Sequence, residues 1–482
     1  MMKSKELFLL QQRFDLMFKY LYVKYQEKYG EKTDFFKKLY LEHMRIFNNF
    51  YEREPVKNTP FDFFNNFDKL ISEIHTKGFN ANYPIPVDKE NQIINGAHRL
   101  SVCFAKNLDV EISKENKKFD SKAYNYDYFR KRHINSIYAD YVALEYVNLN
   151  PNAYIVNLQP VTSPEFDYKV ENILNKYGFI YYKKNIFLSY NGLVNLKKLF
   201  YGKEKWIGNL QNDFRGARKH AKASSGAYPL RAYVFVCDNL KNVRKAKEEI
   251  RNIYKIGNNS VHINDTQEEA IEIAQTYFND NSLFMLNNRP YNFEDKLFDQ
   301  MLTKLPPNVC LAGSTPLNVF GLRKSNDLDF LSLVPTGNKD EHIGKWENFY
   351  PYNKYEIILN PKNYFYYKGR KVVTLEITKL MKINRNEAKD LKDIKLIDNF
   401  IENSLDYSSI QNTNFEIYQD ILQKLITSIR AEVLFKTSLR RRIINLFFPN
   451  RSLFRMYKYK ILSKICSGKK KKHYLDKLER MN

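Results

Sequence analysis

The sequence predicts a multidomain protein that combines α/β and α+β units, with three domains in a row and a basic helical tail. With 482 residues, the chain is long enough for roughly two to four domains, each with its own core. Hydrophobic residues make up 43% of the chain and aromatic residues 15%, a composition typical of folded proteins rather than disordered ones. The spacing of apolar residues also changes along the chain, from helical intervals to the short runs of strands.

The N-terminal part of the chain reads as a helical region followed by a small αβ unit. Residues 1–67 carry apolar residues at three- and four-residue intervals, as in ELFLLQQRFDLMFKYLYVKY. In residues 68–125, brief apolar runs bracket Gly96, and a helix is expected to follow. His98 and Arg99 would then stand at the N-terminus of that helix, where backbone N–H groups and a guanidinium favour an anion.

The stretch PIPVDKENQIINGAHRLSVCFAKN resembles the ParB/sulfiredoxin-like domains, whose signature is Gly-x-His-Arg between a strand and a helix. The resemblance covers residues 68–125 and implies that Gly96, His98 and Arg99 contact phosphate. Members of this superfamily bind or hydrolyse nucleotides, phosphorylate amino acids or reduce sulfinic acids, so the resemblance does not select one reaction. The alternative is that Arg99 pairs with a surface carboxylate. Residues 126–151 are expected to be a connector with helical parts.

Residues 152–290 alternate between strand and helix patterns, and a histidine lies in the polar segment GNNSVHINDTQEEA. Thr266 and Glu269 have the spacing of a capping box, which predicts a helix through EEAIEIAQTYF. His262 would then lie in the loop before this helix, where N–H and hydroxyl groups favour a phosphate. The alternative is an ordinary loop histidine that is bonded to a neighbouring carbonyl.

Residues 152–290 resemble a diverged nucleoside diphosphate kinase, a family with a ferredoxin-like fold. YIVNLQP and GFIYYKKNIFLS resemble its first two strands, LKKLFYG its nucleotide-flap helix, and YPLRAYVFVCDNLKNVRKAKEEIR its third strand and following helix. GNNSVHINDTQEEA resembles the loop that bears the phosphohistidine. The resemblance implies that His262 is phosphorylated in transit and that Asn259 orients its loop. It also implies that three residues contact phosphate or base: Tyr201, Arg244 and Arg251.

This assignment is chemically sound, because a neutral imidazole can attack a γ-phosphoryl group near pH 7 while arginines neutralise its oxygens. The sequence nevertheless departs from the family at three positions. The lysine after the first strand is Gln159, the glycine after the histidine is Ile263, and Asn264 stands where a serine is usual. Loss of the lysine removes a positive charge, which favours phosphoryl transfer to another acceptor over nucleotide exchange. An inactive domain kept for nucleotide binding is the alternative.

Residues 295–437 contain a pair of carboxylates in GSTPLNVFGLRKSNDLDF. In a strand, Asp327 and Asp329 would face the same side and could ligate one Mg²⁺ or Mn²⁺ ion, which suits metal-assisted nucleotidyl or phosphoryl transfer. Gly313 and Ser314 would open a helix, where the serine can bond a phosphate. The alternative is a solvated strand end.

This segment resembles the DNA polymerase β-like nucleotidyltransferases, close to their minimal and AbiEii-like members. The resemblance implies a third carboxylate on a neighbouring strand, for which Glu376 in VVTLEI is the candidate metal ligand beside Asp327 and Asp329. It also implies that KINRNEAKDLKDIKLI corresponds to the family's terminal Lys–Asp region, with Lys389, Asp390 and Asp393.

Charge is concentrated at the C-terminus. The net charge is +24, and residues 438–482 hold 14 Lys or Arg against 2 Asp or Glu, or +12. Aliphatic and aromatic residues alternate with these charges, which favours an amphipathic tail on an anionic membrane surface. RNA binding or a merely solvated tail are the alternatives.

The apolar runs, the N-terminal segment and the cysteines bear on where in the cell the protein is expected. No apolar run is long enough for a membrane-spanning helix, and the N-terminal segment is too interrupted by charge for a signal peptide. The four cysteines are widely separated and fit neither a zinc nor a disulfide pattern. We therefore expect a cytoplasmic protein without structural metal, peripheral at the inner membrane face.

Three candidate phosphate sites on one chain predict a multifunctional phosphoryl and nucleotidyl transferase that uses a nucleoside triphosphate. Its acceptor is expected to be a small alcohol or sugar of bacterial surface polysaccharide synthesis. A nucleic-acid-associated enzyme, either tRNA-modifying or of the toxin type, is the first alternative. A membrane-docked scaffold of inactive nucleotide-binding domains is the second.

Overall fold

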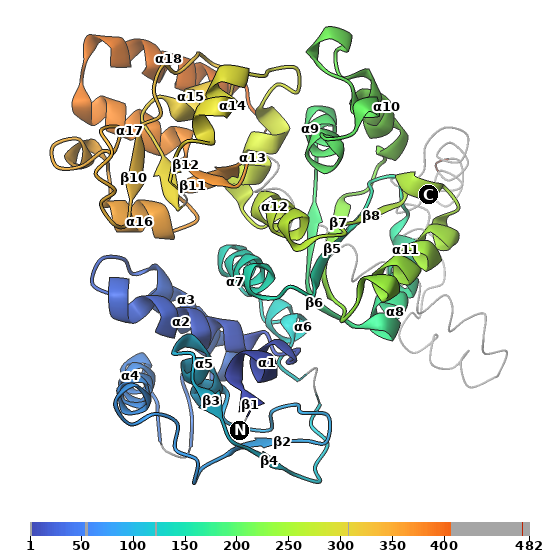
Figure 1. Cartoon of the computed structure of the whole chain (residues 1–482), viewed down its shortest axis with the longest axis vertical. Helices are drawn as coiled ribbons and strands as arrows, with labels where there is room; N and C mark the ends of the chain where they lie inside the picture. Colours follow the sequence, from blue (N-terminus) through green and yellow to red (C-terminus); the bar gives the residue numbers. More distant parts are fainter. Residues whose placement is uncertain (1, 54–55, 121–122, 307, 406–474, 476–482) are drawn as a thin grey trace. The chain divides into compact units, whose positions relative to one another are not determined.

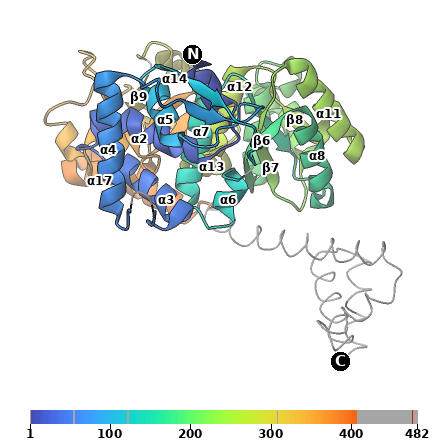
Figure 2. The same cartoon turned by 90° about the horizontal axis from the view of Figure 1, so that it is seen from below.

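The computed structural model describes residues 2–53, 56–120, 123–306, 308–405 and 475 (Figure 1). The chain divides into two compact units, Met1–Thr413 and Asn414–Asn482, and all of the described residues except residue 475 belong to the first unit. The predicted basic tail at 438–482, apart from residue 475, and the end of the predicted 295–437 domain lie outside the described residues. The described part is a mixed α/β structure with small sheets, as the sequence predicts (Figures 1 and 2).

The N-terminal region is helical and carries two small sheets. Helix α4 begins at a capping box in which the Thr59 side chain accepts from the Asp62 N–H group. Strand β1 pairs antiparallel with β3, and β2 pairs parallel with β4. The bounds of these elements are β1 Met2–Lys3, α1 Ser4–Leu9, α2 Asp15–Tyr29, α3 Phe35–Asn48, α4 Pro60–Lys77, β2 Ile85–Val87, α5 Ala97–Ala105, β3 Asp109–Val110 and β4 Ile112–Lys114.

Two further helices follow in the predicted connector, α6 (Tyr126–Arg130) and α7 (Ser136–Leu149). The N-cap side chains Asn125 and Asn135 each accept a hydrogen bond from the first turn of the helix that they precede. The predicted helical parts of residues 126–151 are thus present.

The central sheet has four antiparallel strands in the order β6–β7–β5–β8. Helices α8 and α11 cover one face, and α12 packs on β5 from the other (Figure 1). Helices α9 and α10 are inserted between β6 and β7. The bounds are β5 Ala153–Leu158, η1 Pro164–Phe166, α8 Asp167–Tyr177, β6 Phe179–Ile186, α9 Tyr190–Tyr201, η2 Lys205–Ile207, η3 Leu210–Asn212, α10 Arg215–Ser224, β7 Leu230–Val236, α11 Leu240–Tyr254, η4 Gly257–Asn259, β8 Val261–Ile263 and α12 Gln267–Tyr277.

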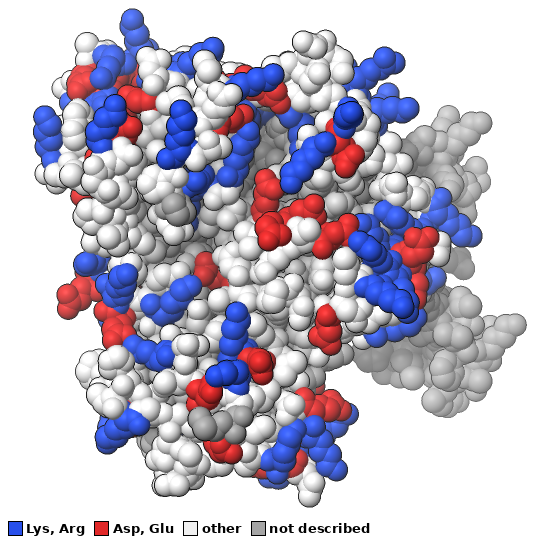
Figure 3. Space-filling view, viewed as in Figure 1, with Lys and Arg blue, Asp and Glu red and all other residues white. Residues whose placement is uncertain are grey.

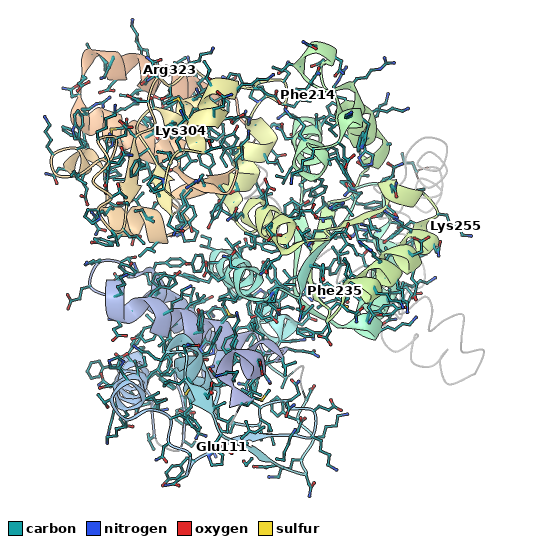
Figure 4. The ribbon with its side chains drawn as sticks, viewed as in Figure 1. Glu111, Phe214, Phe235, Lys255, Lys304 and Arg323 are labelled. Carbon is teal, nitrogen blue, oxygen red and sulfur yellow. The ribbon has the colours of Figure 1, made fainter. Side chains whose placement is uncertain are left out.

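Alternation along the central strands decides which residues enter the core under α8 and α11. Val156 and Leu158 of β5 pack there with Phe235 of β7, which Figure 4 labels. Asn157, between the first two, faces the opposite side of the sheet and pairs in register with His262 of β8. The histidine therefore lies on the face away from α8 and α11.

The last described region has a second four-stranded sheet in the order β10–β9–β12–β11. Strands β9 and β12 are parallel, and the outer pairs are antiparallel. Its core includes Leu311, Phe330 and Val372. The bounds are α13 Asp280–Asn288, α14 Lys296–Leu302, β9 Val309–Leu311, α15 Thr315–Val319, β10 Phe330–Ser332, η5 Glu347–Phe349, α16 Lys354–Leu359, β11 Tyr364–Tyr367, β12 Arg370–Val373, α17 Leu375–Arg385 and α18 Ala388–Glu402.

Two chain-wide features bear on the sequence predictions. Among the described helices, none combines the length and the apolar character that crossing a membrane requires. The described cysteines, Cys103, Cys237 and Cys310, are buried as free thiols.

Candidate functional site

His262 is held at the centre of a small aromatic cluster. It is the middle residue of β8, and its flanking residues Val261 and Ile263 are buried in the core under α8 and α11. Its Nδ1 atom lies 3.1 Å from the hydroxyl oxygen of Tyr201, at the end of α9. The imidazole also stacks on the ring of Phe200, with centroids 4.3 Å apart and planes 13° apart. The resemblance to nucleoside diphosphate kinases placed Tyr201 and His262 in one site, and the structure brings them together.

The prediction that His262 lies in a loop is wrong. The histidine is in strand β8, and the loop that leads into α12 begins after it. Asn264 supports this loop, because its Oδ1 accepts from the Ile155 N–H at 2.6 Å and its Nδ2 donates to the Thr266 carbonyl at 2.7 Å. Before the strand, Ser260 Oγ donates to the Gly257 carbonyl at 2.7 Å. The segments on either side of β8 are thus held by hydrogen bonds of Ser260 and Asn264, whereas the predicted Asn259 lies in η4.

The surroundings of His262 keep its ring neutral. Burial is the largest cause that lowers the pKa of His262 well below its ordinary value, and the nearby charges of Lys247, Lys197 and Arg251 lower it further. Lys247 is held in place by its Nζ hydrogen bond to the Ile263 carbonyl at 2.8 Å. A neutral imidazole at pH 7 keeps a lone pair, which is what a nucleophile towards phosphorus requires.

Lys197 is a site residue that the sequence motifs did not reveal. It lies on α9 one turn before Tyr201, is fully buried, and donates from Nζ to Gln159 Oε1 at 2.7 Å. Burial lowers the pKa of Lys197 to about 7. The i, i+4 spacing to Tyr201 places both side chains on one face of a helix, a signal that the sequence contained.

The two predicted arginines differ in their positions. Arg251 is close enough for its charge to lower the pKa of His262, and its Nε atom is buried without a hydrogen-bond partner among the described residues. Arg244 is 65% exposed and forms an ion pair with the exposed Asp265 at 3.5 Å. It belongs to the basic surface of α11, over which Lys and Arg gather in Figure 3 and which ends near Lys255 in Figure 4. Arg251 therefore lies at the candidate site and Arg244 at its outer surface.

The paired aspartates precede β10 instead of lying in a strand as predicted. Leu328 between them is buried in the second core, while Asp327 is exposed and Asp329 is partly exposed. The exposure of Asp327 and the partial exposure of Asp329 leave both side chains at the surface, while Leu328 enters the core. Asp329 Oδ2 lies 3.4 Å from His342 Nε2, a neighbour that the sequence motifs did not indicate.

Gly313 and Ser314 open helix α15 as predicted, and they contact the aspartate segment. Gly313 has a positive φ of 60°, and a Cβ atom there would stand 2.1 Å from Asp329 Oδ2. Ser314 Oγ lies 2.6 Å from Ser325 Oγ, and Ser325 donates to the Asp327 carbonyl at 2.8 Å. The glycine is needed because any side chain would displace the Asp329 carboxylate.

The expected third carboxylate is on the wrong type of element. Strand β12 ends at Val373, and Glu376 lies exposed in the first turn of α17, which the Thr374 side chain caps. Among the residues that the structure describes, no three His, Cys, Asp or Glu side chains are gathered to hold a metal ion. Asp327 and Asp329 remain the two predicted ligands that adjoin each other.

Helix α18 contains the predicted Lys–Asp region, in which the lysine is exposed and the two aspartates are buried. Lys389 is 69% exposed and pairs with Glu387 at 2.9 Å. Arg323, labelled in Figure 4, binds Asp393 through two hydrogen bonds of 2.6 and 2.7 Å. Buried Lys382 lies 2.7 Å from Asp393 and 3.3 Å from Asp390. These contacts join α17 to α18 and give the aspartates a structural role.

The Gly-x-His-Arg unit has its donors engaged by the protein. Gly96 caps α5 with a φ of 87°, as a helix start after a tight turn requires. His98 lies against Phe67 and has its Nε2 atom 3.1 Å from the Tyr40 hydroxyl, and burial lowers its pKa well below the ordinary value. Arg99 donates to the backbone carbonyls of Tyr83 and Pro84. The partner of Arg99 is thus backbone, neither a surface carboxylate nor an open anion site.

Comparisons with known proteins add no family. No protein-family model matches the chain, and neither the curated proteins nor the solved structures contain a match.

Proposed function

We propose that residues 152–290 form a phosphotransferase that carries a phosphoryl group from a nucleoside triphosphate through His262 to the hydroxyl of a small alcohol or sugar. The observation that carries this proposal is the neutral ring of His262, held beside Tyr201 and surrounded by cationic side chains. The ring supplies a lone pair, and the cations favour a polyphosphate next to it.

The topology of the central sheet supports the same proposal. The chain order β-α-β-β-α-β with the strand order β6–β7–β5–β8 is that of a ferredoxin-like sheet. In this arrangement, and among the residues that the structure describes, β8 is an edge strand with β5 as its neighbour in the sheet.

The proposed reaction has two steps. In the first, a ring nitrogen of His262 attacks the γ-phosphorus, the N–P bond forms as the bond to the β,γ-bridging oxygen breaks, and the nucleoside diphosphate leaves. In the second, an acceptor hydroxyl oxygen attacks the phosphorus, the P–N bond breaks, and the hydroxyl proton passes to solvent. Lys247 and Arg251 stabilise the negative charge on the transferred group in both steps.

The test is incubation with γ-labelled ATP of the wild type, His262→Ala and, as a matched control, His75→Ala, since His75 is exposed on α4. Acid-labile label on the wild type and the control, and none on His262→Ala, is the expected result. Label that persists on His262→Ala contradicts the proposal. Nucleotide binding without any label favours an inactive scaffold instead.

The second proposed activity is metal-assisted nucleotidyl transfer at Asp327 and Asp329, with Mg²⁺ or Mn²⁺. It is favoured by the glycine at position 313, which lets the Asp329 carboxylate lie directly against the turn that opens α15. We expect α-label from ATP or CTP to be incorporated by the wild type and by Asp238→Asn, a substitution at an exposed position. Incorporation that survives the double change Asp327→Asn/Asp329→Asn contradicts this activity.

A further inference from the structure

The side chain of Lys197 is enclosed at the phosphate site without a compensating acid. Its residue is 0% exposed, and no carboxylate among the described residues lies within ion-pair distance of Nζ. Its hydrogen bond goes to the neutral amide oxygen of Gln159 at 2.7 Å. Enclosing an ammonium group without an opposite charge is costly, so a protein that retains one gains from an anion nearby.

Lys197 reaches the end of the strand on which the kinase family carries its lysine. Gln159 follows β5 directly, and its N–H donates to the Ser260 carbonyl at 2.9 Å. Ser260 in turn stands two residues before His262, and β5 pairs with β8 through Leu158 and Val261. The ammonium of Lys197 is therefore joined through one side chain to the position after the first strand.

Other donors at the site also lack partners. Arg251 Nε and His220 Nδ1 are both buried without a hydrogen-bond partner among the described residues. Tyr201 joins His220 to His262, because its ring lies against His220, with centroids 5.5 Å apart, and its hydroxyl lies beside His262. Buried donors are normally satisfied, so the unpartnered Nε of Arg251 on α11 points to a missing acceptor.

We propose that Lys197 supplies, from helix α9, the positive charge that is lost at Gln159, and that it makes this site bind the polyphosphate group of its substrate. Its charge would enter from α9 and is joined to the end of β5 through the Gln159 side chain. This inference rests on the proposed function for the identity of the site, but it concerns anion binding and requires no phosphoryl transfer.

The test is calorimetric titration of the full chain with inorganic tripolyphosphate and with ATP. We expect Lys197→Gln to weaken binding of both about tenfold or more, as loss of one charge-assisted hydrogen bond implies. The exchange of the two residues, Gln159→Lys with Lys197→Gln, is expected to restore the affinity to within about threefold, because the ammonium is returned to the same place. If Lys197→Gln weakens binding of ATP but not of tripolyphosphate, Lys197 acts on the nucleoside part of ATP, and the proposal is contradicted.

The matched control is Lys198→Gln. Lys198 is next in sequence, but it donates to the Tyr291 carbonyl at 2.6 Å and pairs with Glu294 at 3.3 Å, away from the site. Its affinity for tripolyphosphate is expected to equal that of the wild type. Lys197→Met, of similar shape and without polarity, serves if the glutamine variant fails to fold. Undiminished binding by a folded Lys197 variant overturns the inference, as does an exchange variant that folds but does not regain affinity.

The outcome separates this inference from the proposed function. If His262 is labelled but polyphosphate binding does not depend on Lys197, only the inference about Lys197 is contradicted. If polyphosphate binding depends on Lys197 but His262 is never labelled, only the proposed phosphotransferase activity is contradicted.

Discussion

The Tyr201 hydroxyl oxygen lies 3.1 Å from Nδ1 of His262, and the two residues are 61 positions apart in the chain. The ring of Tyr201 stands at 83° to the imidazole, while Phe200 stacks on it. The hydroxyl thus fixes the rotation of a ring that the aromatic contacts hold in plane. Tyr201 is therefore a positioning residue for the proposed nucleophile.

Replacement of Tyr201 by phenylalanine should separate positioning from packing. We expect Tyr201→Phe to slow labelling of His262 by about fivefold, since one hydrogen bond of about 1 kcal/mol orients the ring. Stability should change little because the aromatic contacts remain. Tyr177→Phe, which removes a hydroxyl bonded to Glu249 on α11, is the control. A labelling rate equal to that of the wild type would exclude a positioning role.

Anion affinity should depend on pH through Lys197. The groups around it are Gln159, His220 and His262, with Lys247 and Arg251 beyond them; burial lowers the pKa of His220 to about 4, and that of His262 is well below its ordinary value. Neither histidine therefore changes its charge between pH 7 and 8, the range in which the effect of Lys197 is measured. Since burial lowers the pKa of Lys197 to about 7, and a bound anion raises it again, affinity is expected to fall as the pH rises above 7.

The measurement is tripolyphosphate affinity at pH 6, 7 and 8. Lys247 carries a lowered pKa as well, from burial first, so its methionine variant is compared in parallel. We expect the slope between pH 7 and 8 to disappear in Lys197→Gln and to persist in Lys247→Met. A slope that survives Lys197→Gln would assign the titration to another group.

Acid should destabilise the fold through its buried neutral histidines. His220 has its pKa lowered to about 4, so the unfolded chain binds a proton below about pH 6.5 that the folded chain does not. His220 therefore leaves the free energy of unfolding unchanged above about pH 6.5, and it lowers that free energy as the pH falls from 6.5 towards 4. We expect His220→Asn to flatten the dependence of the unfolding free energy by up to about 1.4 kcal/mol per pH unit there. Urea denaturation at pH 7, 6 and 5 measures it, and equal slopes would contradict the expectation.

The contact between Gly313 and Asp329 can be tested by comparing alanine substitutions at Gly313 and at Gly337, a second glycine with a positive φ. Gly313→Ala would place Cβ against the Asp329 carboxylate, whereas Gly337, with a φ of 73°, has no atom within 4 Å of such a Cβ. Both variants should lose about 1 kcal/mol from backbone strain. Only Gly313→Ala is expected to abolish α-label incorporation. Equal activity in the two variants would show that the position of Asp329 is unimportant.

Much of the central sheet could be predicted from sequence because its signals are local. The run YIVNLQP predicts β5 to within two residues, and Thr266 accepts from the Glu269 N–H at 3.3 Å as its capping spacing predicts. The predicted reciprocal bond is displaced, since the Glu269 carboxylate accepts from Asp265 instead. The strand limits and the helix start thus follow from alternation and capping alone.

The errors lie where tertiary contacts decide. The resemblance to nucleotidyltransferases implies a strand position for Glu376, but the Thr374 cap begins a helix there. The spacing of Lys197 to Tyr201 is visible in the sequence, but its burial against Gln159 depends on a tertiary contact. Arg99 was given an anion because its engagement with the Tyr83 carbonyl depends on a distant loop. The predicted tail at 438–482 and its membrane surface stay predictions.

The most direct test of the central claim is identification of the labelled residue after incubation with γ-labelled ATP, by peptide mapping under alkaline conditions that preserve N–P bonds. We expect a single labelled peptide that contains His262, and its loss in His262→Ala. Label on another residue, or a wild type that binds ATP without becoming labelled, would contradict the claim that this histidine transfers phosphate.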